Sequence, residues 1–355
     1  MPVFPKIDHL CNGSDNNFNL IRIICAWGVL FAHSYVLISN RPNLIDPFQA
    51  YFKIGMGTFF VTVFFAISGF LICRSLDRSR DLKKYFWARS KRIFPALIVV
   101  LLLTVFALGP IIAQDDLASY FSSPITWHYL LNINLLNTHT QFELPGVFEN
   151  NPHPSTVNGS LWTLPIETWM YVMTAVIFSL CRFTKRYLAP WKLYLVLLIV
   201  FIPVICYKAE QYLTTQQDEH YSMLLFIAAF AMGSIMYSLR QHIAIHWLPA
   251  LAMLCLVPWL SDNIVYPIYY SLVISYCVLA VAYLPKGFIR KYNLIGDYSY
   301  GLYIYAFPIQ QLIVLQIPNI TFSSMLILST AITLCFATLS WHLIESPILN
   351  KSQKG

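Results

Sequence analysis

Long apolar runs separated by short polar connections fill almost the whole chain. Most of these runs are close to the roughly 20 residues that a helix needs to cross the hydrocarbon core of a membrane. The shortest, 245–260, contains two prolines, so we expect it to be tilted or broken. The pattern predicts an all-α polytopic membrane protein with about ten transmembrane helices. The ten apolar stretches are 18–38, 54–73, 93–112, 161–181, 190–207, 221–238, 245–260, 264–284, 298–317 and 322–344.

The composition agrees with this fold class. Hydrophobic residues make up 57% of the 355 residues, charged residues only 11%, and the mean hydropathy is +0.60. Soluble globular proteins of this length do not have such a composition. No soluble segment interrupts the pattern, so we expect a single membrane domain over residues 1–355.

Basic residues predict the orientation, because Lys and Arg in short connections stay on the cytoplasmic side. The connection 74–92 contains eight of them, and the connections 182–192 and 285–297 are also basic. Residues 113–160 contain neither Lys nor Arg. We therefore predict that both termini are cytoplasmic and that 113–160 is an extracytoplasmic loop. The net charge of +7 follows from this asymmetry, so we expect no nucleic-acid partner.

Cysteine usage indicates neither a disulfide framework nor a metal site. The eight cysteines are scattered, mostly within apolar stretches, and no two form a Cys-x-x-Cys pair. Such residues usually act as small buried hydrophobes.

Two ionisable residues, Arg22 and His33, lie inside the first apolar stretch. Ionisable side chains are costly in hydrocarbon, so they usually face the protein interior and serve a function. Eleven residues make three helical turns plus roughly 20°, which places both on one helix face about 16 Å apart. With the predicted orientation, Arg22 lies near the cytoplasmic end and His33 nearer the outside. The alternative is structural: an arginine that reaches the interface and a histidine bonded to a neighbouring helix.

A carboxylate is predicted at the depth of His33. Glu167 lies in the fourth apolar stretch, about 9 Å below the start of its segment. A carboxylate beside an imidazole would orient it, fix its tautomer and raise its basicity. Tyr171 shares this helix face at i, i+4, and Pro165 is expected to kink the helix toward a cavity. The alternative for Glu167 is a structural partnership with an arginine or a tyrosine elsewhere in the bundle.

The predicted cytoplasmic side carries a second charged group. Arg89 and Arg92, with a lysine between them, form a cationic collar suited to the phosphates of a nucleotide-like donor. The alternative for each is a simple positive-inside anchor. At the inner end of the tenth stretch, His342 and Glu345 are spaced i, i+3, and we expect Glu345 to pair with an arginine on that side, with shaping of the donor site as the alternative.

In these features the chain resembles the integral-membrane acyltransferase 3 family of bacterial cell-surface O-acyltransferases. The resemblance implies transfer of an acyl group, usually acetyl from cytoplasmic acetyl-CoA, to a sugar hydroxyl of an extracytoplasmic or membrane-linked glycan. It also implies a multi-pass protein of the bacterial inner membrane without a permanently bound cofactor. Six motifs in order carry it: Arg22-x10-His33, Phe64-Phe-Ala-Ile-Ser-Gly-Phe-Leu-Ile72, Arg89-x-x-Arg92, Asn158-Gly-Ser-Leu-Trp162 with Glu167, Tyr298-Ser-Tyr-Gly-Leu-Tyr-Ile-Tyr305, and His342-Leu-Ile-Glu-Ser-Pro347.

One departure from the family pattern affects the mechanism. Many members read Leu-Tyr-Leu-Trp-His-Trp-Pro where this chain has Ala306 in place of the histidine. A mechanism that requires this ninth-stretch histidine is therefore excluded. Tyr303 and Tyr305 remain as hydroxyl donors, with aromatic packing as their more ordinary role.

The resemblance and the residue pattern together suggest roles. Arg89 and Arg92 would hold the CoA phosphates, and Arg22 would steady the thioester end of the donor. His33, oriented by Glu167, would deprotonate the acceptor hydroxyl, or would itself be acylated and relay the group. The residues expected to line the acceptor site are Asn158, Ser160, Trp162 and Tyr171, with an interfacial anchor as the alternative for Trp162.

A competing class of function is a glycan or lipid transporter or flippase. In such a protein the intramembrane Arg22, His33 and Glu167 would line a substrate or proton path. Against it, no internal repeat relates the two halves of the chain. A membrane scaffold without chemistry would leave these three residues unexplained.

Overall fold

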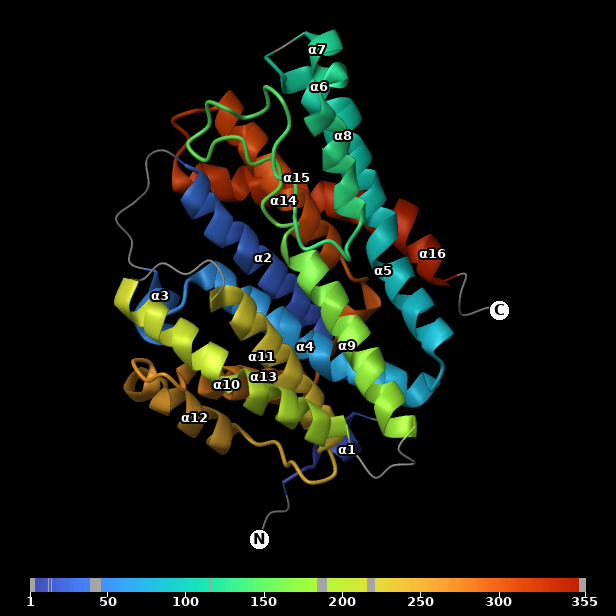
Figure 1. The fold of residues 1–355 in the computed structure, drawn as a ribbon, viewed down its shortest axis with the longest axis vertical. Helices are drawn as coiled ribbons and strands as arrows, with labels where there is room; N and C mark the ends of the chain where they lie inside the picture. Colours follow the sequence, from blue (N-terminus) through green and yellow to red (C-terminus); the bar gives the residue numbers. More distant parts are fainter. Residues whose placement is uncertain are drawn as a thin grey trace. The chain divides into compact units, whose positions relative to one another are not determined.

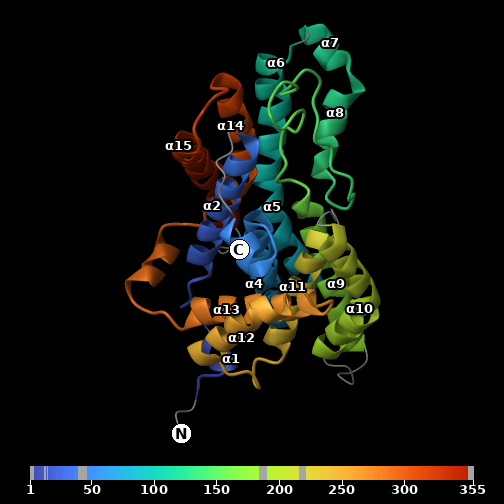
Figure 2. The same ribbon diagram turned by 90° about the vertical axis from the view of Figure 1, so that its left-hand side faces the viewer.

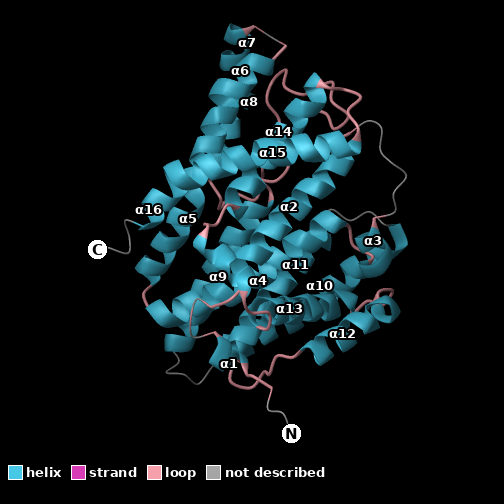
Figure 3. Cartoon of the chain, turned by 180° about the vertical axis from the view of Figure 1, so that it is seen from behind, coloured by secondary structure: helices cyan, strands magenta, loops and turns pink. Residues whose placement is uncertain are grey.

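The computed structural model describes residues 4–11, 13, 15–38, 46–114, 116–183, 190–215 and 221–350. Within these ranges the regular elements are all helices and no strand occurs (Figure 3). The elements labelled η are short π-helical (η1, η4) or 3₁₀ (η2, η3) segments. In chain order (Figure 1) the elements are α1 (Ile7–Leu10), α2 (Phe18–Leu37), α3 (Pro47–Phe52), α4 (Met56–Ser79), α5 (Leu82–Leu103), η1 (Thr104–Leu108), α6 (Gly109–Ile112), α7 (Leu117–Ser122), α8 (Pro124–Leu130), η2 (Leu131–Ile133), α9 (Thr163–Phe183), α10 (Pro190–Thr215), α11 (Tyr221–Ser238), α12 (Trp247–Leu260), α13 (Tyr266–Tyr283), η3 (Phe288–Leu294), α14 (Ser299–Gln316), α15 (Phe322–Ser340), η4 (Trp341–Glu345) and α16 (Ser346–Asn350).

Each of the ten apolar stretches forms a helix. Among the described residues, eight helical segments are long and apolar enough to cross a membrane. The stretch 245–260 forms the shorter apolar helix α12, and 298–317 forms α14. The all-α polytopic class is therefore confirmed. The figure of about ten spans and the cytoplasmic placement of both termini stay predictions.

The predicted connection 74–92 is not a loop. Helix α4 continues to Ser79 and α5 already begins at Leu82, so Arg89 and Arg92 project from a helix. The two helices are separated by Arg80, which has a left-handed φ of 50°, and Asp81. Hydropathy marks only the apolar part of a helix. Lys, Arg and Leu have high helix propensities, so a helix rich in them can extend beyond its apolar part.

The chain divides into two compact units. Unit 1 comprises Met1–Cys25, Ile45–Leu82 and Trp169–Ile295. Unit 2 comprises Ala26–Leu44, Lys83–Thr168 and Gly296–Gly355. Because α2 and α9 each contribute residues to both units, the candidate site residues on these helices are divided between the units as well.

The core of unit 1 is the contact between α4 and α11. A side chain at Gly69 would collide with the carbonyl of Phe230, and one at Gly233 would collide with the carbonyl of Ala66. The Ser234 hydroxyl donates to the Gly69 carbonyl at 3.1 Å. Small residues permit such close approach, which matters in lipid because no hydrophobic force drives helices together there. The motif around Gly69 thus serves helix packing.

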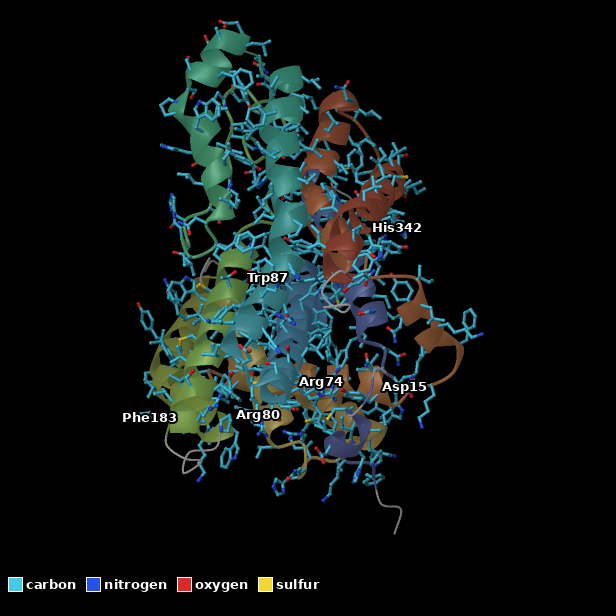
Figure 4. All side chains as sticks on the ribbon, turned by 90° about the vertical axis from the view of Figure 1, so that its right-hand side faces the viewer. Asp15, Arg74, Arg80, Trp87, Phe183 and His342 are labelled. Atoms are coloured by element: carbon cyan, nitrogen blue, oxygen red, sulfur yellow. The ribbon has the colours of Figure 1, made fainter. Side chains whose placement is uncertain are left out.

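An ion-pair network joins three segments of unit 1. Arg240 Nε lies 2.9 Å from Asp8 Oδ1, and its Nη2 lies 3.3 Å from Asp77 Oδ2. These contacts tie the residues after α11 to α1 and to the end of α4. Other residues toward the same end of this unit, labelled in Figure 4, are Asp15, Arg74, Arg80 and Phe183.

Unit 2 contains α14 and α15 packed side by side (Figure 2). A side chain at Gly301 would press on the Ala337 backbone, so this pair also depends on a glycine. The predicted loop 113–160 begins with the short helices α7, α8 and η2. The Trp127 ring of α8 packs on the Phe106 ring of η1, with ring centroids 6.2 Å apart. Residues 134–162 then follow an irregular path without a helix.

Candidate active site

One face of α14 carries the polar contacts of unit 2 that are relevant to chemistry. Tyr300, Tyr303, Phe307 and Gln310 are spaced i, i+3, i+7 and i+10, which places them within an arc of about 80°. Tyr303 is half-buried and the other three are buried. Their neighbours form three groups along the helix, from Asp297 at its beginning to Gln310 near its end.

The first group, the arginine cluster, consists of Arg92, Asp297 and Glu345. Arg92 Nη2 bonds to Asp297 Oδ2 at 2.6 Å, and Nη1 lies 3.7 Å from Glu345 Oε2. Glu345 Oε1 also accepts a hydrogen bond from Ser340 Oγ at 3.0 Å, and Asp297 Oδ1 accepts from the Ser299 backbone N–H at 3.2 Å. The predicted pairing of Glu345 with an arginine is confirmed. The charge of Arg92 is offset by two carboxylates.

The π-helical segment η4 brings Glu345 inward. A π turn inserts an extra residue and re-aims the side chains around it. Glu345 is 1% exposed, whereas His342, labelled in Figure 4, lies on the exposed side with Nε2 3.2 Å from Tyr298 Oη. The two residues of the predicted i, i+3 pair therefore have different environments.

The second group surrounds the beginning of α9. Thr163 Oγ1 and Tyr303 Oη are 2.8 Å apart. Glu167, one turn later, lies within electrostatic range of the Tyr300 and Tyr303 hydroxyls. These neighbours fit the alternative in which Glu167 is a partner of tyrosine. The predicted pairing of Glu167 with His33 stays a prediction.

The third group, the histidine cluster, consists of His33, His153 and Phe307. The His33 ring meets Phe307 edge-on with centroids 5.0 Å apart, and the His153 ring does so at 6.0 Å. The two imidazoles lie within electrostatic range of one another. His33 is half-buried, and within the described part of the chain its buried Nδ1 has no hydrogen-bond partner.

Other buried polar atoms of unit 2 also lack a hydrogen-bond partner among the described residues. They include Ser160 Oγ, on a side chain that is 2% exposed, and Gln310 Oε1, on one that is 0% exposed. Gln310 Nε2, in contrast, donates to the Leu30 carbonyl at 2.8 Å and to Ser34 Oγ at 2.7 Å. An unpaired buried polar atom costs about 1–3 kcal/mol, so these atoms are candidates to bind polar groups of a substrate.

Asn158 fastens the irregular segment to α14. Pro308 has no N–H, so the carbonyl of Ile304 loses its helical partner. Asn158 Nδ2 donates to that oxygen at 2.9 Å, and its Oδ1 accepts from the Ser160 backbone at 3.1 Å. A side chain at Gly159 would collide with the Phe307 ring. The predicted acceptor-site residue Asn158 thus uses both polar groups of its amide within the protein.

Gln311 fixes the position of His153. Its side chain is 0% exposed, and Nε2 donates to the carbonyls of His153 at 2.8 Å and Thr156 at 2.7 Å. Asn151 Nδ2 donates to Gln311 Oε1 at 2.9 Å. Sequence reasoning missed His153, because the histidines of the predicted loop, His128, His139 and His153, are widely spaced and show no pattern of metal ligands. The adjacent glutamines within an apolar stretch were the available signal.

The other predicted site residues have separate positions. Arg22 and Tyr171 belong to unit 1, where Arg22 acts electrostatically on the Cys25 thiol. Arg89 is half-buried on α5, and its buried Nε has no hydrogen-bond partner among the residues described. Trp162 is half-buried directly before α9. In the described ranges, no group of three or more His, Cys, Asp or Glu residues could hold a metal ion.

Comparison with known proteins relates the chain to acyltransferases. A family model described as an acyltransferase domain matches residues 15–342. An O-acetyl transferase of Shigella phage Sf6 is 30% identical over 346 residues, covering 95% of this chain and 97% of the phage protein. Nodulation protein 10 of Rhizobium leguminosarum bv. viciae is 26% identical over 376 residues, covering 97% and 96% of the two chains. Peptidoglycan O-acetyltransferase OatA of Listeria monocytogenes is 26% identical over 330 residues, which cover 81% of this chain and 50% of OatA. No solved structure matches the chain.

Proposed function

Because this chain belongs to the acyltransferase 3 family, we propose that it is an O-acetyltransferase that moves acetyl from cytoplasmic acetyl-CoA to a hydroxyl of an extracytoplasmic or lipid-linked polysaccharide. The names of two relatives support acetyl as the group, and the name of the Listeria relative supports a glycan as the acceptor. We place the protein in the bacterial inner membrane, as its apolar helices and bacterial relatives favour. The names of the Shigella phage and Listeria relatives favour acyl transfer over the transporter or flippase alternative.

The observation that carries the proposal is the state of His33. It is an ionisable side chain within a membrane-spanning helix, half-buried beside Phe307, with a nitrogen that lacks a partner among the described residues. A sugar hydroxyl is a poor nucleophile at neutral pH and needs a base. His33 takes the hydroxyl proton while the hydroxyl oxygen bonds to the acetyl carbon and the thioester C–S bond breaks. The CoA thiolate leaves and takes up a proton from cytoplasmic water.

On the donor side, the proposal uses Arg89 and Arg92. Arg89 is the best placed to bind the CoA phosphates, because its Nε has no hydrogen-bond partner among the described residues. Arg92 is already paired with Asp297 and Glu345, so it holds the nearby helices in position for the donor.

On the acceptor side, Ser160 is the best placed to bind the sugar, since its buried hydroxyl lacks a partner among the described residues. Trp162 offers an aromatic face to the sugar. Asn158 shapes the site by holding Ser160 and the Ile304 carbonyl. Glu167 orients His33, directly or through the tyrosines near it.

Mass spectrometry of envelope glycans tests the function. Cells would carry the wild-type chain, His33→Ala, the control His139→Ala or an empty vector. His139 is an exposed histidine of the same irregular segment. We expect one added acetyl mass with the wild type and with His139→Ala, and none with His33→Ala inserted at equal amount. Identical glycan masses in all four strains would overturn the proposal.

A second experiment distinguishes the two roles open to His33. Membranes with the purified chain would receive labelled acetyl-CoA without a glycan acceptor. Label that stays on wild-type protein and is absent from His33→Ala would indicate an acyl-histidine relay. Unlabelled protein that nevertheless acetylates added glycan would indicate a base.

A further inference from the structure

A second imidazole meets His33 at the same aromatic ring. His153 comes from the irregular segment, and His33 comes from α2. Both rings contact the Phe307 ring edge-on, with interplanar angles of 80° for His33 and 72° for His153. Because Phe307 is 5% exposed, this meeting point lies inside unit 2.

The position of His153 is built into the fold. Nε2 of the fully buried Gln311 donates a hydrogen bond to the backbone carbonyl of His153. Six residues later, Gly159 packs against the Phe307 ring. An irregular segment needs such fixed contacts to present a side chain reproducibly, because its backbone has no helical hydrogen bonds of its own. Two buried residues of α14, Gln311 and Phe307, therefore hold the segment at His153 and again at Gly159.

We propose that His153 is the second imidazole of the acceptor site and takes over the proton that His33 removes from the acceptor hydroxyl. This inference rests on the proposed function. The hydroxyl proton passes to His33 and from there to His153, which is half-buried and returns it to extracytoplasmic water. The CoA thiolate is protonated from cytoplasmic water, so the total number of protons is unchanged.

Electrostatics supports one proton on the pair at a time. The two imidazoles lie within electrostatic range, and two positive charges repel in a low-dielectric interior. Once His153 has released its proton to extracytoplasmic water, His33 can accept the next one.

The test measures the initial rate at which isotope-labelled acetate enters envelope glycans of intact cells, per amount of membrane-inserted protein. His153→Phe keeps an aromatic ring against Phe307 but cannot carry a proton. His153→Ala leaves space that external imidazole can fill. His139→Ala is the matched control from the same segment. Thermal unfolding of each purified chain in detergent reports folding.

We expect both His153 variants to lower the rate by about 10²-fold, the scale of general acid–base catalysis. External imidazole should restore part of the rate in His153→Ala and should not change it in His153→Phe. His139→Ala should match the wild type. Rescue by imidazole separates proton transfer from a structural role, which a diffusing ring cannot replace.

Two results would overturn the inference while the proposed function stands. One is a wild-type rate in His153→Phe. The other is a folded His153→Ala chain whose low rate imidazole does not raise. Absence of label with the wild-type chain would instead count against the proposed function, so the two failures are distinguishable.

Discussion

The arginine cluster and the histidine cluster lie toward opposite ends of one face of α14 and differ in how their polar groups are paired. In the arginine cluster, Arg92 meets two carboxylates at 2.6 Å and 3.7 Å, and both carboxylates accept further hydrogen bonds. In the histidine cluster, His33 Nδ1 has no hydrogen-bond partner among the described residues.

This difference indicates a division of labour. A buried ion pair holds the helices that carry its two partners in one arrangement. Removing one partner destabilises the fold, because the other charge then stays buried without compensation. A buried polar atom without a hydrogen-bond partner lowers the stability of the fold until a substrate group forms that hydrogen bond. The comparison teaches that the arginine cluster holds the helices together, whereas the histidine cluster keeps a buried nitrogen available, as the chemistry that we propose for it requires.

The strongest way to break the comparison is His33→Leu. Leucine removes the unpaired nitrogen at similar volume, so we expect glycan acetylation to fall by about 10²–10⁴-fold. The thermal midpoint of the purified chain should stay the same or rise, because a buried polar group without a partner is lost. A large drop in the midpoint would mean that His33 is structural.

The next largest effect is expected for Arg92→Met. It leaves Asp297 and Glu345 buried without their cation, and we expect the free energy of unfolding to fall by about 3–5 kcal/mol. The measurement is denaturant unfolding in detergent. As a control, the triple variant Arg92→Met, Asp297→Asn, Glu345→Gln should recover much of this loss. A stable Arg92→Met chain that has lost acetylation would move Arg92 into the donor site.

An intermediate effect is expected for Gln311→Met. The change removes the hydrogen bonds to the carbonyls of His153 and Thr156, and we expect a loss of about 1–3 kcal/mol in unfolding free energy. The acetylation rate should fall more than the folded fraction does, because His153 is displaced. Equal losses in rate and folded fraction would show that the anchor serves stability alone.

The smallest expected effect is that of Gly159→Ala. Its new methyl group pushes the Phe307 ring against the two imidazoles, and we expect about a tenfold lower rate with little change in the thermal midpoint. A second change, Phe307→Leu, makes room and should restore part of the rate. If Gly159→Ala alone acetylates like the wild type, the packing at Phe307 does not position the histidines.

The sequence predicted which stretches form helices, but it did not predict well the residues at which those helices begin and end. Long apolar runs must form helices in a membrane, because each backbone group needs a partner within its own segment. The same rule does not apply outside the hydrocarbon, so it did not predict where helices extend beyond the apolar stretches. Helix α5 begins eleven residues before the stretch 93–112, and this extension carries Arg89 and Arg92. The π-helical segments η1 and η4 also escaped prediction, since nothing in hydropathy marks an inserted residue.

The site was predictable only where a single residue carried the signal. His33 stood out as an ionisable residue in an apolar stretch, and Glu345 was expected to pair with an arginine, as it does. His153 carried no such signal, because a histidine in a polar loop is ordinary. Its role depends on where the irregular segment runs, and a hydrogen bond to Gln311, far along the chain, decides that.

By itself the sequence determined the membrane class, the apolar helices and the resemblance that the family match confirms, because burial in lipid and motif order are local properties of the chain. Only the tertiary structure decided which polar groups meet. It placed Asp297 and Glu345 at Arg92, Tyr300 and Tyr303 near Glu167, and His153 with His33 at Phe307. The physical reason is that these partners lie far apart along the chain, and their contacts depend on how helices and an irregular segment pack in three dimensions.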